Sequence, residues 1–198
     1  KNHVVESTQP EADIERIMRE FIPRAFRRPV TDEEMRPFVE LALGRFAAGR
    51  TFEQAVRTGV TAVLCSPRFL LLNSEPVVDD YVLASRMSYF LWSTMPDQEL
   101  LDLAADGKLS DPNVRYAQVE RMIKDSKSEA FVSDFTGQWL DLYDLEFTTP
   151  DKKLYPEYDP LLLAAMLGES QHFFRHVLEE NLSVTSFIDA NWTFLNQR

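Results

Sequence analysis

Apolar residues recur every three or four positions over most of this chain, and that spacing constrains its fold more than any other feature. Residues three and four apart share one face of an α-helix, so the pattern predicts helices that each bury one side. Two of the predicted helices begin at a capping box, in which Thr31 precedes Glu34 and Thr51 precedes Gln54 by three positions. We therefore expect an all-α protein.

Interruptions of the pattern divide the chain into parts. Residues 1–12 are polar and aperiodic, which indicates a linker. The next stretch predicts a three-helix unit over 13–73, packed against a larger helical unit over 79–198. Pro23 is expected to end or kink the first helix. The apolar run over 69–73 is expected to be a buried link, because no second strand is visible to pair with it.

Both ends of the chain lack the features of a natural terminus. The first residues do not form a signal peptide, and the last stop inside an apolar pattern. We expect the chain to be part of a longer protein, with its larger helical unit truncated at the C-terminus.

Charge and cysteine content exclude several classes of function. The 198 residues carry 32 acidic and 21 basic side chains, and a net charge of −11 disfavours binding to nucleic acid. No stretch of 18 apolar residues is present, so no membrane span is expected. The single cysteine, Cys65, excludes an intrachain disulfide, a cysteine metal cluster and a haem-attachment motif. We interpret Cys65 as a small buried apolar residue.

One candidate metal site lies in the longest predicted helix. Glu169, His172 and His176 occupy positions i, i+3 and i+7 and therefore share one helix face. A carboxylate and two imidazoles so placed could hold Zn or Fe. A di-iron site would need a second Glu-x-x-His pair, and the only other histidine, His3, lies in the predicted linker. The alternative is a polar helix face on which His176 is placed favourably near the helix end.

Two further groups are candidates for ligand binding or docking. Arg24, Arg27 and Arg28 could bind a carboxylate, sulfate or phosphate group. They could instead pair with the nearby acids Glu20, Asp32, Glu33 and Glu34.

The second group belongs to a long acidic loop over 143–159. Its tyrosines, Tyr143, Tyr155 and Tyr158, could stack on sugar rings, which makes carbohydrate a candidate partner. Trp92 and Trp139 lie in helical apolar stripes and are predicted to be core residues.

Four separated blocks of sequence resemble known families. The block over 21–31 is similar to the opening of the domain of unknown function 1595, and the blocks over 80–97, 135–140 and 193–196 are similar to the domain of unknown function 1592. Both helical domains occur in large exported proteins of the planctomycete type, which often carry a cytochrome c module. The resemblance implies a periplasmic or otherwise exported location, with haem c in another domain and no cofactor in this fragment. It supplies no catalytic residues.

We therefore expect a non-catalytic helical module that serves as scaffold and docking surface for sister domains of the same polypeptide. A docking face should appear as an exposed apolar patch of several hundred Å². The alternative is that the chain contributes part of a pocket to an exported oxidoreductase or a carbohydrate-active assembly.

Overall fold

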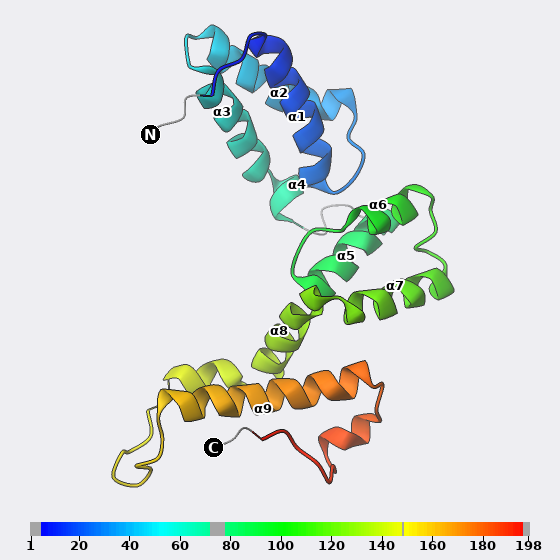
Figure 1. The fold of residues 1–198 in the computed structure, drawn as a ribbon. Helices are drawn as coiled ribbons and strands as arrows, with labels where there is room; N and C mark the ends of the chain where they lie inside the picture. The colour runs from blue at the N-terminus through cyan, green and yellow to red at the C-terminus, as the bar shows by residue number, and fades with distance from the viewer. Residues whose placement is uncertain (1–4, 72–77, 148, 196–198) are drawn as a thin grey trace. The chain divides into compact units, whose positions relative to one another are not determined.

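The computed structural model describes residues 5–71, 78–147 and 149–195, and within these ranges it contains only helices and irregular connections (Figure 1). The prediction of an all-α fold is confirmed. In chain order the elements are α1 (Pro10–Phe26), α2 (Asp32–Ala47), α3 (Phe52–Leu64), α4 (Pro67–Leu70), α5 (Asp80–Trp92), α6 (Gln98–Ala105), α7 (Pro112–Lys124), η1 (Ser126–Ser128), α8 (Glu129–Trp139), η2 (Leu142–Phe147), α9 (Pro160–Glu179) and η3 (Val184–Phe187), where η marks a 3-10 helix.

Internal contacts group the chain into two compact units. Unit 1 comprises residues 1–86 and 95–111, and unit 2 comprises residues 87–94 and 112–198. This grouping differs from the boundaries expected from the sequence, because residues 80–86 and 95–111 join the first helices. Helix α1 also begins at Pro10, inside the expected linker. Each unit is described by itself below.

The core of unit 1 lies between α1, α2 and α3. Ile14, Met18 and Ile22 present one face of α1 and are fully buried. Helix α3 approaches α1 closely at Gly59, where an added Cβ would lie 2.8 Å from the Met18 sulfur. Both predicted capping boxes are present, with Thr31 and Thr51 as the N-caps of α2 and α3. Three helices with short turns therefore form as the pattern predicts.

Three local expectations in unit 1 are wrong, the first of them in part. Helix α1 continues through Pro23 to Phe26, where Ala25 and Phe26 are buried, so Pro23 does not end the helix, and the alternative of a kink stays a prediction. Cys65 is exposed at the end of α3, where Val63 takes the buried position instead. The run expected to be a buried link begins in the short helix α4. Its described residues Leu70 and Leu71 are exposed, and residues 72–73 lie outside the described ranges.

Asp79 and Asp80 at the start of α5 have different roles. The Asp79 carboxylate accepts a hydrogen bond from the Val82 backbone N–H at 2.8 Å, as a helix-capping residue does. The Asp80 side chain is buried and accepts the backbone N–H groups of Leu109 and Ser110 at 2.7 and 3.2 Å. Asp80 thereby joins α5 to the turn that precedes α7, a contact over 29 residues of sequence.

In unit 2, helix α9 contacts α7, α8, η2 and η3. Trp92 is buried, and its indole N–H donates to the Met122 carbonyl at 2.9 Å, so its predicted core position is confirmed. The same prediction for Trp139 is wrong, because that side chain is 50% exposed at the end of α8. None of the helices in the described ranges has the length and apolarity needed to cross a bilayer.

Candidate functional site

Aromatic side chains of unit 2 form a connected network along α8 and α9. Phe131 lies 5.0 Å from Phe90 and 5.4 Å from Phe135, and Phe135 lies 5.7 Å from Trp139, measured between ring centroids. Phe174 of α9 is buried and packs against three of these rings. Spacings of this size are typical of favourable aromatic pairs. The network therefore gives α8 a fixed position on α9.

One edge of this network is open to solvent. The exposed fractions are 63% for Phe90, 39% for Phe135, 50% for Trp139 and 44% for Leu140. We call these four residues the aromatic surface. Such rings are buried in most proteins, so a run of exposed ones that touch a common core indicates an interaction site.

A small hollow adjoins the aromatic surface. It has a volume of about 220 Å³ and is lined by Trp139, Leu140, Glu169, Ser170, Phe173, Phe174, Phe187 and Thr193. Glu169 is the one ionisable residue in this lining, and its carboxylate accepts a hydrogen bond from the Thr193 hydroxyl at 2.7 Å. Ligand pockets usually have volumes of about 300 to 1,000 Å³, so this hollow suits a few apolar atoms better than a substrate.

The predicted metal ligands lie on the same helix. His176 packs edge-on against Trp192 at 5.0 Å, and His172 lies 6.0 Å from Phe194. Glu169 bonds Thr193, so all three side chains contact the segment that follows η3. Within the described ranges, no group of three His, Cys, Asp or Glu side chains is placed to hold a metal ion. The metal-binding hypothesis stays a prediction.

The three predicted tyrosines are not joined by ring contacts within the described part of the chain. Tyr143 lies in η2 and packs against Gly137, where an added Cβ would be 2.5 Å from the tyrosine ring. Tyr155 is 54% exposed and Tyr158 is half-buried. Tyr143 thus packs against the backbone at position 137, and a residue larger than glycine there would collide with its ring. The Tyr155 side chain, by contrast, is exposed and accessible to a partner. The first part of the predicted loop is the 3-10 helix η2.

The three predicted arginines of unit 1 have three different environments. Arg27 is 4% exposed, and its guanidinium donates to the carbonyls of Ala25, Arg68 and Phe69 at 3.2 to 3.3 Å. Arg28 pairs with the Glu34 carboxylate at 2.8 Å, as the alternative interpretation expected. The Arg24 guanidinium has no hydrogen bond or ion pair with a described residue. Arg24 and Arg27 nevertheless line one pocket of unit 1 together with Asp97, whereas Arg28 is not part of that lining. The ligand-binding hypothesis for these arginines stays a prediction.

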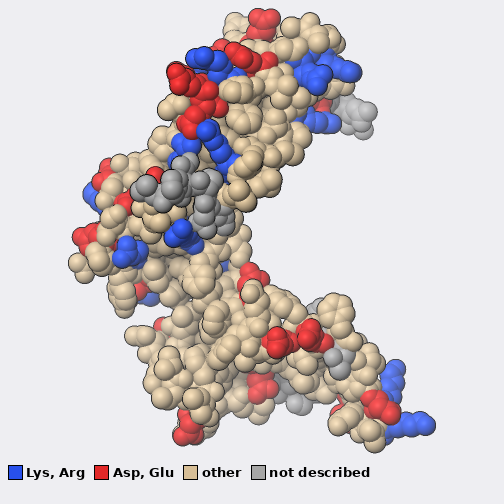
Figure 2. All heavy atoms as spheres, turned by 180° about the vertical axis from the view of Figure 1, so that it is seen from behind, with Lys and Arg blue, Asp and Glu red and all other residues tan. Residues whose placement is uncertain are grey.

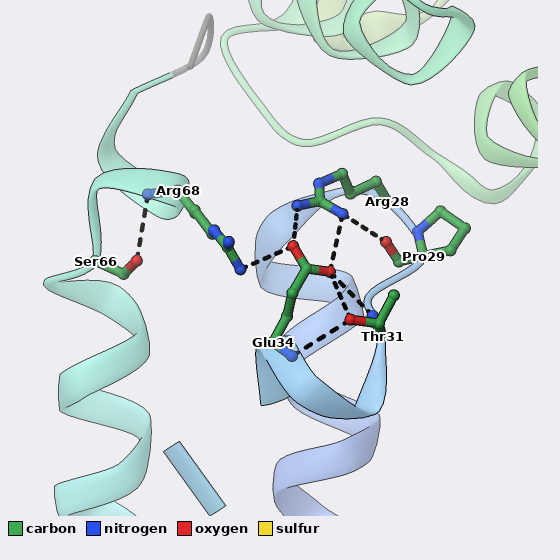
Figure 3. A network of polar contacts seen from close by, with 6 residues as sticks. All are labelled: Arg28, Pro29, Thr31, Glu34, Ser66 and Arg68. Atoms are coloured by element: carbon green, nitrogen blue, oxygen red, sulfur yellow. Dashed lines mark hydrogen bonds and ion pairs between the residues drawn. The ribbon is translucent and has the colours of Figure 1, made fainter. Parts of the chain in front are cut away.

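Glu34 is the centre of a polar network that links the start of α2 to Arg28 and to Arg68 of α4 (Figure 3). Its carboxylate accepts hydrogen bonds from Arg28 and from the Thr31 backbone N–H, and it forms an ion pair with Arg68 at 2.9 Å. These contacts lower the pKa of Glu34 from 4.5 to about 2, chiefly through the Arg28 hydrogen bonds. The folded state therefore favours the ionised carboxylate.

This pKa shift predicts how the stability of unit 1 depends on pH. A lowered pKa contributes stability that is present above the unfolded value of 4.5 and is lost as the pH falls towards about 2. Glu34→Gln retains the capping box and removes the charge, and we expect it to cost roughly 1 to 2 kcal/mol at pH 7, after allowance for solvent screening. Denaturant unfolding followed by circular dichroism measures the difference.

The control for this prediction is Glu33→Gln, which removes an exposed carboxylate from the same helical turn. The difference between Glu34→Gln and the wild type should shrink below pH 4.5 and vanish near pH 2. A difference that is constant between pH 7 and pH 3 contradicts the assignment of the effect to the ionised carboxylate.

The aromatic network and the buried Arg27 are the features that sequence reasoning missed. The density of aromatic residues over 131–139 and 173–194 is a signal for the network. No local pattern signals the burial of Arg27, because two of its three carbonyl partners, on Arg68 and Phe69, are more than 40 positions away.

Comparison with known proteins finds two family models along the chain. The model described as PSD4, a protein of unknown function (DUF1592), matches residues 78–198. The model described as PSD5, a protein of unknown function (DUF1595), matches residues 13–73. These are the families that the sequence blocks resemble, so that identification is confirmed. No curated protein and no solved structure matches the chain significantly.

Proposed function

The chain belongs to the DUF1592 family of proteins of unknown function, and on that premise we propose that it is a docking module that binds sister domains through its aromatic surface. The exposure of Phe90, Phe135 and Trp139 carries this proposal. Aromatic rings are enriched where proteins associate, and they contribute most when the partner excludes water from them.

The hollow beside Trp139 indicates the chemistry of the partner. Its small volume and the aromatic side chains in its lining suit one inserted apolar side chain, and the Glu169 carboxylate in the same lining suits a neighbouring Lys or Arg. The complementary surface therefore carries an apolar side chain beside a cation. The net charge of −11 also favours a partner with a basic face.

Context for the proposal comes from the resemblance stated above. That resemblance implies an exported protein that carries a c-type cytochrome module. We extend the proposal to that arrangement, in which the partner domains include a cytochrome module and the assembly is periplasmic. The role of the present chain is to hold its neighbours in place, and the haem chemistry belongs to the other module.

Calorimetric titration with the purified sister domains of the full-length polypeptide, the cytochrome module included, tests the docking proposal. We expect Trp139→Ser to weaken the binding of one of these domains by about 30-fold, which corresponds to about 2 kcal/mol for an interface anchor. The matched control is Tyr116→Ser, which removes a ring that is 63% exposed and lies on α7, outside the aromatic surface.

Two results oppose the docking proposal. The first is the absence of binding to every sister domain. The second is an equal loss of binding in Trp139→Ser and Tyr116→Ser, because the aromatic surface would then have no special role. Trp139→Ser should leave the secondary structure unchanged by circular dichroism, since half of the side chain is already in water.

Carbohydrate binding is a second candidate function, which one observation favours. The half-exposed Trp139 ring and the Glu169 carboxylate line the same shallow hollow, and a sugar ring can stack on such a ring while its hydroxyls bond such an acid. A glycan array distinguishes the two functions. A saccharide that binds the wild type and not Trp139→Ser would favour carbohydrate over protein as the partner.

A further inference from the structure

Three arginines surround one shallow pocket in unit 1, apart from the aromatic surface and from the Glu34 network. We call it the arginine pocket. It has a volume of about 360 Å³ and is lined by Arg45, Arg50, Gln54, Arg57 and Thr58. These residues come from the last turn of α2, the connection to α3 and the first half of α3. Figure 2 shows basic side chains gathered at this end of unit 1.

The backbone between α2 and α3 brings these side chains together. Gly49 has a φ of 81°, a left-handed conformation that glycine adopts without a steric penalty, and its N–H donates to the Phe46 carbonyl. The Arg50 N–H donates to the Arg45 carbonyl at 3.2 Å, so the two arginines flank one tight turn. The capping box of Thr51 then fixes the start of α3 beside them.

Two positive charges in the arginine pocket are uncompensated. Arg57 pairs with Glu53, but the guanidinium groups of Arg45 and Arg50 have no hydrogen bond or ion pair with any residue in the described ranges. The Gln54 side-chain oxygen accepts the Thr51 N–H, so its amide NH₂ remains available to donate. The Thr58 hydroxyl donates to the Gln54 carbonyl and does not add a donor.

We propose that the arginine pocket binds a tetrahedral oxyanion, namely the sulfate or phosphate group of a small ligand. The planar, forked donors of arginine match the oxygen atoms of these groups, and two unpaired forks with an amide supply several charge-assisted hydrogen bonds. Placing like charges side by side is unfavourable unless an anion joins them. The volume exceeds that of the oxyanion alone, so it accommodates part of the molecule that carries the group.

The ligand is small because the rest of the chain repels long polyanions. With a net charge of −11, binding of nucleic acid through this pocket would bring many phosphates near acidic surface. The charge of a single sulfate or phosphate group is neutralised by Arg45 and Arg50, so the group is repelled less by the acidic surface than a long polyanion is. This inference does not depend on the proposed docking function, which involves unit 2.

Calorimetry or NMR titration with inorganic phosphate, inorganic sulfate, a sugar phosphate and a sugar sulfate tests the proposal at constant ionic strength. We expect saturable binding by the wild type and at least about 10-fold weaker binding by the double variant Arg45→Gln/Arg50→Gln, from the loss of charge-assisted hydrogen bonds. The control is Arg36→Gln, which removes one exposed charge from α2 outside the pocket and should leave binding within about twofold of the wild type.

The comparison of the two sugar esters identifies whether phosphate or sulfate is the preferred source of the oxyanion. Absence of saturable binding by all four probes overturns the proposal, as does an equal weakening by the double variant and by Arg36→Gln. Thermal unfolding in chloride should be nearly the same for all three proteins, because exposed arginines contribute little to stability.

Discussion

We expect Phe174→Ala to lower the free energy of unfolding of unit 2 by about 3 to 5 kcal/mol, the usual cost of truncating a buried phenylalanine. The Phe174 ring is 7% exposed and lies within 5.2 to 6.4 Å of the rings of Phe135, Phe187, Phe131 and Trp139. Removing it leaves a cavity between α8 and α9 and withdraws the support of the aromatic surface. Urea unfolding followed by tryptophan fluorescence measures the loss.

Tryptophan fluorescence suits this experiment because Trp92, Trp139 and Trp192 all belong to unit 2. The matched control is Phe147→Ala, the same substitution at a ring that is 86% exposed, and we expect it to change stability by less than about 0.5 kcal/mol. Equal unfolding midpoints for Phe174→Ala and Phe147→Ala would refute the role assigned to the aromatic network.

Comparing Phe174→Ala with Trp139→Ser distinguishes residues that support the aromatic surface from residues that contact the partner. Trp139→Ser removes an exposed contact and should weaken docking while unit 2 keeps most of its stability. Phe174→Ala removes a buried support and should affect both. A docking surface built on a rigid network is expected to behave in this way, because its exposed rings are held in place before the partner arrives.

The helices and their starting points could be predicted from the sequence because the information is local. Thr31 and Glu34, like Thr51 and Gln54, lie within one helical turn, so a capping box depends on four residues and little else. The buried stripe of α1, with Ile14, Met18 and Ile22, follows directly from helical spacing.

Exposure could not be predicted so well, because a periodic pattern shows which residues share a helix face but not whether another element covers that face. Trp139 and Cys65 both continue apolar stripes, yet each lies at the end of its helix and is exposed to solvent there. Pro23 shows the opposite error, since α1 stays helical after it as far as Phe26.

The candidate sites were the hardest feature to predict from the sequence, because they depend on contacts between residues that are far apart in the chain. Glu169, His172 and His176 share a helix face as expected, but their contacts are with residues 192–194, about 20 positions later. Of the three arginines in residues 24–28, Arg27 is buried against backbone carbonyls, Arg28 forms an ion pair, and Arg24 has no partner in the described ranges. Proximity in sequence therefore does not give the three side chains the same contacts, although Arg24 and Arg27 line one pocket.

Arg27→Ala should destabilise unit 1 by about 3 kcal/mol, because it removes a buried guanidinium whose hydrogen bonds satisfy carbonyls of Ala25, Arg68 and Phe69. The loss of these donors leaves carbonyl groups without partners at the junction of α1 and α4. Far-UV circular dichroism during urea unfolding follows this change. Tryptophan fluorescence, which reports on unit 2, should be much less affected.

Two further variants determine whether the hydrogen bonds or the backbone conformation cause the effect. Arg24→Ala removes the same side chain from an exposed position with no partner in the described ranges, and should cost less than about 0.5 kcal/mol. Arg27 has a φ of 58°, so Arg27→Gly loses the same hydrogen bonds but relieves roughly 1 kcal/mol of backbone strain relative to alanine. Equal stability of Arg27→Ala and Arg24→Ala would mean that the buried guanidinium does not join α1 to α4.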